Sequence, residues 1–170
     1  MHFAARGGHT ACMRRLQCSG AAVEPETGSG ATPLMWAAVY GRVDAVRWLV
    51  AQGAAATDAS ADWCGTGGHV PTAEFLMAQG VDFASRNDGG HSPLHKASQK
   101  GHAQMVDFLL DHLDPTHVLL KDESGRTAAD LAMEANFPHL ADQIQRRIDA
   151  VATSFPYVTW LEFAAGRGLP

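Results

Sequence analysis

Nine histidines and three cysteines are the side chains of this chain that could support metal or nucleophilic chemistry. A structural zinc site usually shows paired ligands, such as two cysteines separated by two residues, and the three cysteines form no such pair. Four of the histidines recur at fixed places of a repeated pattern: His9, His69, His95 and His102. Because a structural role explains that recurrence, we predict no bound metal and no cofactor.

Cys64 and His69 are close enough in the sequence to be considered as a nucleophile and its base. Such a pair also needs a third group that orients the base and donors that stabilise an oxyanion, and neither is suggested here. The run Gly65-Thr66-Gly67-Gly68 lacks the lysine of a phosphate-binding loop, and no strand precedes it. We therefore predict no catalytic residue, and an enzyme is the least supported class of function.

Composition argues against two further classes. The net charge is −5 with dispersed basic residues, whereas nucleic-acid binding requires a clustered positive face. The apolar stretches are far shorter than the ~20 residues of a membrane span, and the N-terminus has no apolar signal-peptide core. An odd number of cysteines favours a reducing compartment inside the cell, with the cytoplasm preferred over an organelle. Cys12 and Cys18 are expected to be buried as small apolar residues.

Residues suited to a left-handed turn recur at a near-constant stride, which indicates a repeat array. The gaps are 33, 27, 33 and 35 residues, and the members are Gly8, Gly41, Gly68, Gly101 and Asn136. Glycine adopts this backbone conformation without strain, and asparagine is the next best residue. Each turn is therefore expected to join two helices of one repeat.

The letters around each turn predict those two helices. Thr32 can cap the first helix with its hydroxyl, and Pro33 fits the first turn because no amide hydrogen bond is lost there. Apolar residues five, eight and nine positions after the turn keep the helical period and form one stripe: Val46, Leu49, Val50, Val106, Leu109 and Leu110. Gly53 and Gly80 are expected to end the second helices as C-caps.

Two copies carry a resemblance to a known family. One reads Thr32-Pro33-Leu34-Met35-Trp36-Ala37-Ala38, and the other reads Ser92-Pro93-Leu94-His95-Lys96-Ala97-Ser98 followed by Gly101-His102. These letters resemble the ankyrin family, whose unit reads T-P-L-H-x-A, a Gly-His turn, V-x-x-L-L and a closing Gly-Ala. The resemblance covers about residues 1–146.

The resemblance implies an all-α ankyrin-repeat solenoid of stacked helix-turn-helix units with hairpin loops, about five repeats in all. A single helix pair cannot bury its own apolar face, so neighbouring pairs must stack into one cooperative array. The predicted repeats are 1–26, 27–57, 58–85, 86–118 and 119–150. An aromatic C-terminal extension, 151–170, follows the array.

Repeats one and three depart from the pattern. Repeat one begins inside its first helix, so it is either a frayed terminal unit or part of a longer array. Repeat three lacks six residues before Trp63, and each interior glycine at 65 and 67 should cost about 1 kcal/mol of helix stability. We expect a loop or a single turn in place of its first helix, with Trp63 stacked against Trp36. The loss of these six residues reflects either sequence drift in a tolerant repeat or a gap that admits a partner's loop.

Repeat five resembles a C-terminal capping unit. Asp130 replaces the usual His, and a second helix is expected at about 139–148 with a polar outer face. Beyond it, Ser154 should cap a short helix with Tyr157 and Trp160 on one face. So short a helix is marginal alone, so that face must dock either on the solenoid or on a partner.

The family resemblance implies binding of a protein partner through hairpin tips and the outer ends of first helices. The predicted contact residues are Ala31, Val39, Tyr40, Thr66, Asp88, His91, Gln99, Lys100, Glu123, Ser124 and Arg126, together with Tyr157 and Trp160 of the extension. For any single one, a solvated residue without a role is the alternative, because fewer than about a third of interface residues matter energetically.

Two classes of function remain. The chain is either a non-catalytic adaptor or scaffold, or a permanent structural subunit of a larger multiprotein complex anchored by its aromatic extension and by repeat three.

Overall fold

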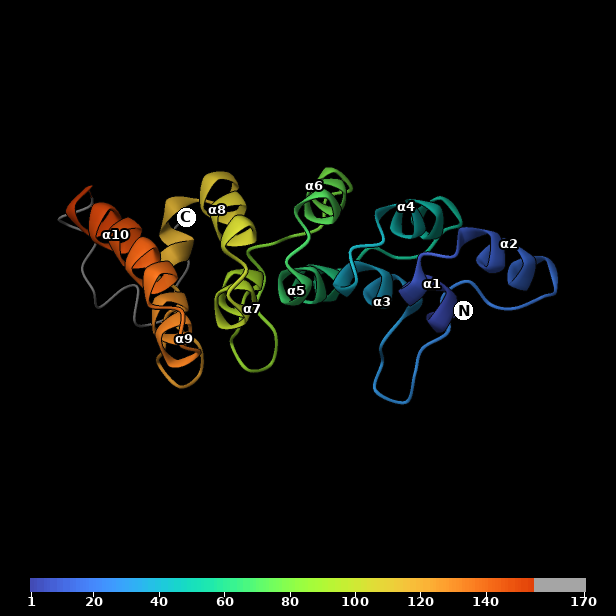
Figure 1. Cartoon of the computed structure of the whole chain (residues 1–170), viewed down its shortest axis with the longest axis horizontal. Coiled ribbons are helices and arrows are strands. Elements are labelled where there is room, and N and C mark those ends of the chain that lie inside the picture. Colours follow the sequence, from blue (N-terminus) through green and yellow to red (C-terminus); the bar gives the residue numbers. More distant parts are fainter. Residues whose placement is uncertain (155–170) are drawn as a thin grey trace.

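The computed structural model describes residues 1–154 as an elongated row of helix pairs (Figure 1). The first helices of the pairs are α1 (His2–Gly7), α3 (Pro33–Val39), α5 (Asp58–Gly67), α7 (Pro93–Lys100) and α9 (Ala128–Glu134). The second helices are α2 (Thr10–Cys18), α4 (Val43–Ala51), α6 (Val70–Ala78), α8 (Ala103–His112) and α10 (Pro138–Ser154). The predicted all-helical stack is confirmed, and no strand occurs within residues 1–154.

The predicted left-handed turns are all present between the two helices of a pair. The φ angles are 73° at Gly8, 64° at Gly41, 74° at Gly68, 73° at Gly101 and 66° at Asn136. A side chain of the next repeat also lies close to the turn at Gly68. A Cβ at this position would lie 2.3 Å from the ring of His102. Both the backbone conformation and this close approach require glycine there.

Side-chain caps begin three of the first helices, α3, α7 and α9, and the cap at Thr32 is the one that the sequence predicts. Thr32 Oγ1 accepts a hydrogen bond from the Met35 amide at 3.3 Å. Ser92 and His95 form a reciprocal capping box at the start of α7, and Thr127 and Asp130 form one at the start of α9. Asp130 therefore does for repeat five what the histidine does for repeat four.

One continuous apolar core runs along the row between the two layers of helices. The second helices contribute the expected stripe, because Val46, Leu49, Val106 and Leu109 are fully buried. First helices lie side by side, α1 against α3, α3 against α5, α5 against α7 and α7 against α9. Each repeat thus buries its neighbours, as a solenoid requires.

The expectation of a loop at the start of repeat three is wrong, because α5 is a regular helix. The two glycines that argued against it lie at helix contacts. A Cβ on Gly65 would lie 2.5 Å from the Pro93 carbonyl oxygen, and one on Gly67 would lie 2.3 Å from the Val39 carbonyl oxygen. The close packing of α5 between its two neighbours, α3 and α7, therefore outweighs the low helix propensity of glycine.

The six residues missing from repeat three removed a hairpin. Hairpin loops closed by backbone hydrogen bonds precede α3, α7 and α9, with pairs Thr27–Ala31, Asn87–His91 and Asp122–Arg126. Figure 1 shows these loops projecting beyond the row of first helices, on the side away from the second helices. Between α4 and α5 the connection is only residues 52–57, too short for such a hairpin.

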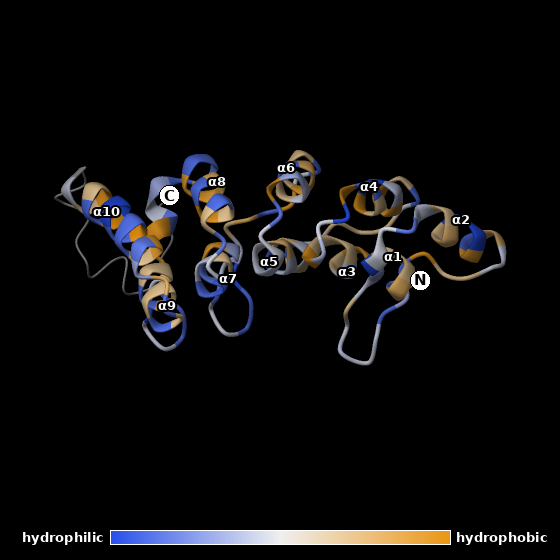
Figure 2. Cartoon of the chain, in the orientation of Figure 1, coloured by the Kyte–Doolittle hydropathy of each residue, from blue (hydrophilic) through white to orange (hydrophobic). Residues whose placement is uncertain are grey.

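The C-terminal end differs from the prediction in length. Two extra residues before repeat five lie near the 3₁₀ helix η1 (Pro115–Leu119), which follows α8. Helix α10 continues past the expected end at about residue 148, as far as Ser154, and the short helix predicted after it lies outside the described residues. Figure 2 shows hydrophilic residues along α10, which agrees with the expected polar outer face. Tyr157 and Trp160 lie outside the described residues.

Two packing expectations are also wrong. Cys12 and Cys18 are exposed on α2, of whose residues only Met13 is buried. Trp36 packs on the preceding repeat, with its ring 6.1 Å from His2 and 6.0 Å from Phe3 between centroids.

Candidate protein-binding surface

The predicted contact residues fall into two groups in the structure. One group lies at the ends of first helices: Val39, Tyr40, Thr66, Gln99 and Lys100. Tyr40, Gln99 and Lys100 are exposed, whereas Val39 and Thr66 are half-buried. These side chains lie on the side of the first helices that no neighbouring repeat covers completely.

The second group lies in the hairpins before α7 and α9. Asp88, Glu123 and Ser124 are exposed at the tips, while His91 and Arg126 are half-buried. Ala31, in the hairpin before α3, is only 5% exposed, and its carbonyl accepts from His2 Nε2 at 3.0 Å. Ala31 therefore offers a partner almost no side-chain surface.

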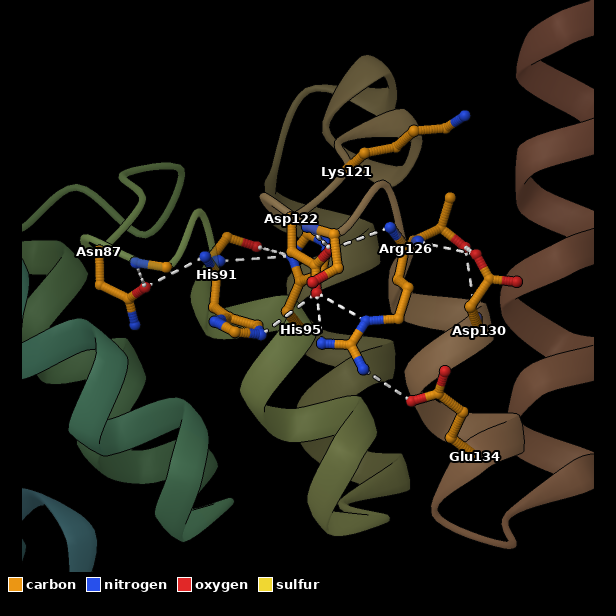
Figure 3. A network of polar contacts seen from close by, with 12 residues as sticks. Asn87, His91, His95, Lys121, Asp122, Arg126, Asp130 and Glu134 are labelled. Carbon is orange, nitrogen blue, oxygen red and sulfur yellow. Dashed lines mark hydrogen bonds and ion pairs between the residues drawn. The ribbon is translucent and has the colours of Figure 1, made fainter.

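Asp122 organises the hairpin of repeat five from a buried position. Its side chain is 1% exposed, and Oδ1 accepts from the amides of Ser124 and Arg126 at 2.9 Å each. The Arg126 side chain donates from Nε to Oδ2 at 3.0 Å (Figure 3). Burial would raise the pKa of Asp122, but these hydrogen bonds outweigh it and hold the pKa below its ordinary value.

This network extends to both sides of the hairpin. Arg126 Nη1 donates to Glu134 Oε2 at 2.9 Å, which ties the loop to α9. His91 Nε2 lies 3.4 Å from Asp122 Oδ2 and links the hairpins of repeats four and five. Arg126, predicted as a contact residue, is thus largely engaged in holding its own repeat.

His95 lies beneath the same network and is fully buried. Its Nδ1 lies 2.9 Å from Ser92 Oγ and accepts from the Ser92 amide. Burial lowers the pKa of His95 to about 4, with a smaller contribution from His91 nearby, so the ring is neutral at pH 7. His91 and His95 have the four-residue spacing that some zinc sites use, yet no cluster of three potential ligands occurs in the described part of the chain.

The residue after the left-handed turn ties one repeat to the previous one. His102 Nε2 lies 2.9 Å from the Thr66 carbonyl, and Arg42 Nε donates to the Arg6 carbonyl at 3.1 Å. Thr66 therefore contributes its backbone to stacking, which leaves its hydroxyl, hydrogen-bonded to the Asp62 carbonyl, as the surface group.

A polar groove of about 410 Å³ opens between the hairpins of repeats four and five. Its lining comprises Arg86, Asn87, Gly90, Lys121, Asp122 and Glu123. Arg86 spans the two hairpins by donating from Nη1 to the Lys121 carbonyl at 3.4 Å. The sequence analysis missed Arg86 and Lys121 because it selected residues at the hairpin tips, which these two flank. A basic residue at the start of each of two successive hairpins was the pattern that could have indicated them.

An aromatic cluster of Phe3, Trp36 and Tyr40 lies at the other end of the row of first helices. Phe3 is 79% exposed, and the rings of Trp36 and Tyr40 stack at 6.5 Å. The guanidinium of Arg6 lies 4.7 Å from the Tyr40 ring centroid and 5.9 Å from that of Trp36. Sequence analysis missed Phe3 and Arg6, although Arg6 holds the first-helix position of Val39, Thr66 and Gln99, which it did select.

Comparison with known proteins decides the family. The sequence profile for ankyrin repeats, three copies, matches residues 1–60 and 62–150. The chain belongs to the ankyrin repeat family. Over 111 residues it is 33% identical to the zebrafish (Danio rerio) protein named ankyrin repeat and SOCS box protein 11. That alignment covers 59% of this chain and 36% of the relative, so this chain spans well under half of the relative's length.

Within this ankyrin array, the one suspected nucleophile lacks a base. Cys64 is buried, and its thiol points to the carbonyl of His69 at 3.8 Å, not to the imidazole. Burial raises the pKa of Cys64 to about 12, so the thiolate is not formed at neutral pH. Among residues 1–154, no helix combines the length and the apolar character that crossing a membrane requires.

Proposed function

We propose that this ankyrin array is a non-catalytic adaptor or scaffold that binds a protein partner through its hairpin tips and first helices. Ankyrin repeats are generally protein–protein interaction modules. The observation that carries the proposal is a division within each first helix. In α7, for example, Leu94 and Ala97 are buried by neighbouring helices, whereas Gln99 and Lys100 are exposed and unnecessary for stacking.

The proposed contacts follow from that division. They are Val39, Tyr40, Thr66, Gln99 and Lys100 on the first helices, and Asp88, His91, Glu123, Ser124 and Arg126 on the hairpins. Ala31 would contribute only through its backbone, because its side chain is buried. Tyr157 and Trp160, outside the described residues, stay in the proposal as the anchor that the C-terminal extension would supply.

The second candidate is a permanent subunit of a larger complex, which exposed apolar side chains favour. Phe3, Met133 and Phe137 are large, exposed and distributed over both ends of the array. A permanent subunit would cover such groups in the assembly. For either candidate we propose a reducing compartment, which the exposed free thiols of Cys12 and Cys18 support.

Site-specific photo-crosslinking in the native source tests the proposal. A photoreactive amino acid replaces Gln99 on α7 in one protein and Arg14, exposed on the second-layer helix α2, in the control. An adaptor should give a discrete adduct with one protein from position 99 and none from position 14. Comparable adducts from both positions would favour the buried subunit, and no adduct from position 99 or from Glu123 would contradict partner binding by this surface.

A truncation separates the contribution of the extension. A chain ending at Ala152 should give the same adduct at position 99 if the first helices bind the partner. Loss of the adduct in this truncated chain, with an unchanged circular dichroism spectrum, would make the extension the anchor.

A further inference from the structure

We propose that the outer faces of α1, α3, α5 and α7, where Phe3, Tyr40 and Lys100 are exposed and Trp36, Trp63 and Lys96 are half-buried, form one binding strip. Its partner would be a segment that carries apolar side chains and, farther along, an acidic run. The aromatic end of the strip, in repeats one to three, would take the apolar side chains. The basic end, in repeat four, would take the carboxylates. This inference rests on the proposed function above and names the chemistry of the partner.

Equivalent positions on the four helices define the strip. The residue five positions before each left-handed glycine is Phe3, Trp36, Trp63 and Lys96 in turn. The residue one position before that glycine is Gly7, Tyr40, Gly67 and Lys100. Because these helices lie side by side in chain order, both rows change from aromatic or small residues to lysine between α5 and α7.

The aromatic end is assembled in the free chain. Phe3 lies edge-on to Trp36, which in turn stacks on Tyr40, and Arg6 covers both of the latter rings. Fixed aromatic rings lose little conformational entropy on binding, and Trp, Tyr and Arg dominate the energetics of protein interfaces. Phe3 remains 79% exposed, so this end still offers apolar surface to another molecule.

The basic end carries charge that the described residues do not neutralise. Lys96 and Lys100 are one turn apart on α7, a spacing at which like charges repel. Neither lysine forms an ion pair with any residue of 1–154, although the chain as a whole has a net charge of −5. Carboxylates of a partner would relieve this repulsion, which is why we infer an acidic run.

The geometry fixes the spacing of the two features. Packed helices lie about 8–10 Å apart, so about 25–30 Å separate Phe3 from Lys96 across three helix intervals. An extended chain covers that span in about eight or nine residues. Acidic residues should therefore follow or precede the apolar group within one short segment.

Selection of random twelve-residue peptides on phage, with the full chain as bait, tests the inference. A parallel selection uses the variant K96E/K100E, and a matched control uses R14E/R15E, which makes the same change of charge on α2. The wild-type chain and the control should enrich peptides with aromatic or aliphatic residues toward one end and Asp or Glu about eight residues away. The variant K96E/K100E should enrich peptides in which Lys or Arg replaces the acidic residues.

Affinities of the best synthetic peptide complete the test. K96E/K100E and the double variant F3A/Y40A should each weaken binding at least about tenfold, while R14E/R15E changes it less than about threefold. Circular dichroism and thermal unfolding verify that each variant is folded. Peptides without acidic residues, or binding unaffected by K96E/K100E, would overturn the inference.

The outcome also separates this inference from the proposed function. If Lys121→Glu weakened peptide binding and K96E/K100E did not, the peptides would bind to the hairpins. That result would contradict the strip and leave the proposed function intact. No enrichment by the wild-type chain would contradict the strip, whereas the crosslinking from position 99 judges the proposed function by itself.

Discussion

The guanidinium of Arg126 closes over the buried carboxylate of Asp122, with Nε at 3.0 Å and Nη2 at 2.9 Å from Oδ2. The other carboxylate oxygen accepts from two amides of the hairpin. The Asp122 carboxylate thus holds its own turn, contacts the preceding repeat through His91, and is linked to α9 through Arg126 and Glu134. The hairpin that we propose as a partner contact is therefore held by a charged group beneath it.

The variant Asp122→Asn should destabilise the chain. The amide keeps the volume, and its Oδ1 can still accept from the two hairpin amides, but its NH2 group takes the place of Oδ2, so the Arg126 guanidinium loses its acceptor and faces another donor. We expect a loss of about 2 kcal/mol in the free energy of unfolding by urea. Asp88→Asn, on an exposed residue of the neighbouring hairpin, should change it by less than about 0.5 kcal/mol. Equal effects of the two substitutions would contradict the role assigned to Asp122.

The same carboxylate predicts a pH dependence with a definite sign. The pKa of Asp122 is lower in the folded chain than its ordinary value of 3.8, so the folded state favours the ionised form. Its contribution is complete above pH 3.8 and is lost as the pH falls through the folded pKa. The difference in unfolding free energy between wild type and Asp122→Asn should therefore be constant from pH 7 to 5 and shrink below pH 3.8.

Local chemistry in the sequence was sufficient to predict the repeat architecture. Glycine at Gly41 or a hydroxyl at Thr32 determines its own turn or cap, and such features need no knowledge of the tertiary structure. The failures at α5 and at Trp36 involve contacts between repeats. The glycines of α5 were counted as helix breakers, whereas their function is to let Val39 and Pro93 approach.

The candidate site was predicted less well than the fold for the same reason. Selecting hairpin tips by position found exposed residues such as Glu123, but it also selected Ala31, which the fold buries. It passed over Asp122, whose importance arises from partners in its own hairpin and in the hairpin of the preceding repeat. Trp36 was paired with the wrong neighbour because only the structure shows Phe3 lying against it.

Histidine 95 predicts a second pH effect in a higher range. Its pKa falls from the ordinary 6.5 to about 4 because burial disfavours the imidazolium. Between these values the unfolded chain binds more protons than the folded chain, so the stability falls as the pH is lowered from 6.5 toward 4. We expect a loss of about 2–3 kcal/mol across this range.

The variant His95→Gln isolates that effect. Glutamine can keep the capping box with Ser92 but does not titrate. Urea unfolding at pH 7 and pH 4.5 should show a smaller loss of stability for His95→Gln than for wild type. An identical pH dependence in the two proteins would show that His95 is not the responsible group.

The three cysteines should differ sharply in reactivity. Cys12 and Cys18 are exposed, whereas Cys64 is buried with its pKa raised to about 12. In a native thiol assay with a colorimetric disulfide reagent, two thiols should react rapidly and the third only after local opening or addition of denaturant. Rapid reaction of all three would show that the α5 packing is open, and Cys64→Ala should remove only the slow phase.

Gly67→Ala sets helix propensity against packing. In an isolated helix this change stabilises by about 1 kcal/mol, and α5 is a helix at this position. In the folded chain the added methyl would lie 2.3 Å from the Val39 carbonyl oxygen, which is backbone and cannot rotate away. Helices α3 and α5 would have to separate, so we expect a net destabilisation of about 2 kcal/mol, measured by urea unfolding.

Gly28→Ala is the matched control, since its new methyl would meet no atom within 4 Å, and it should have almost no effect. Stabilisation by Gly67→Ala would mean that the glycines of α5 are remnants of a damaged repeat and that the close contact of these first helices is not required for the stack.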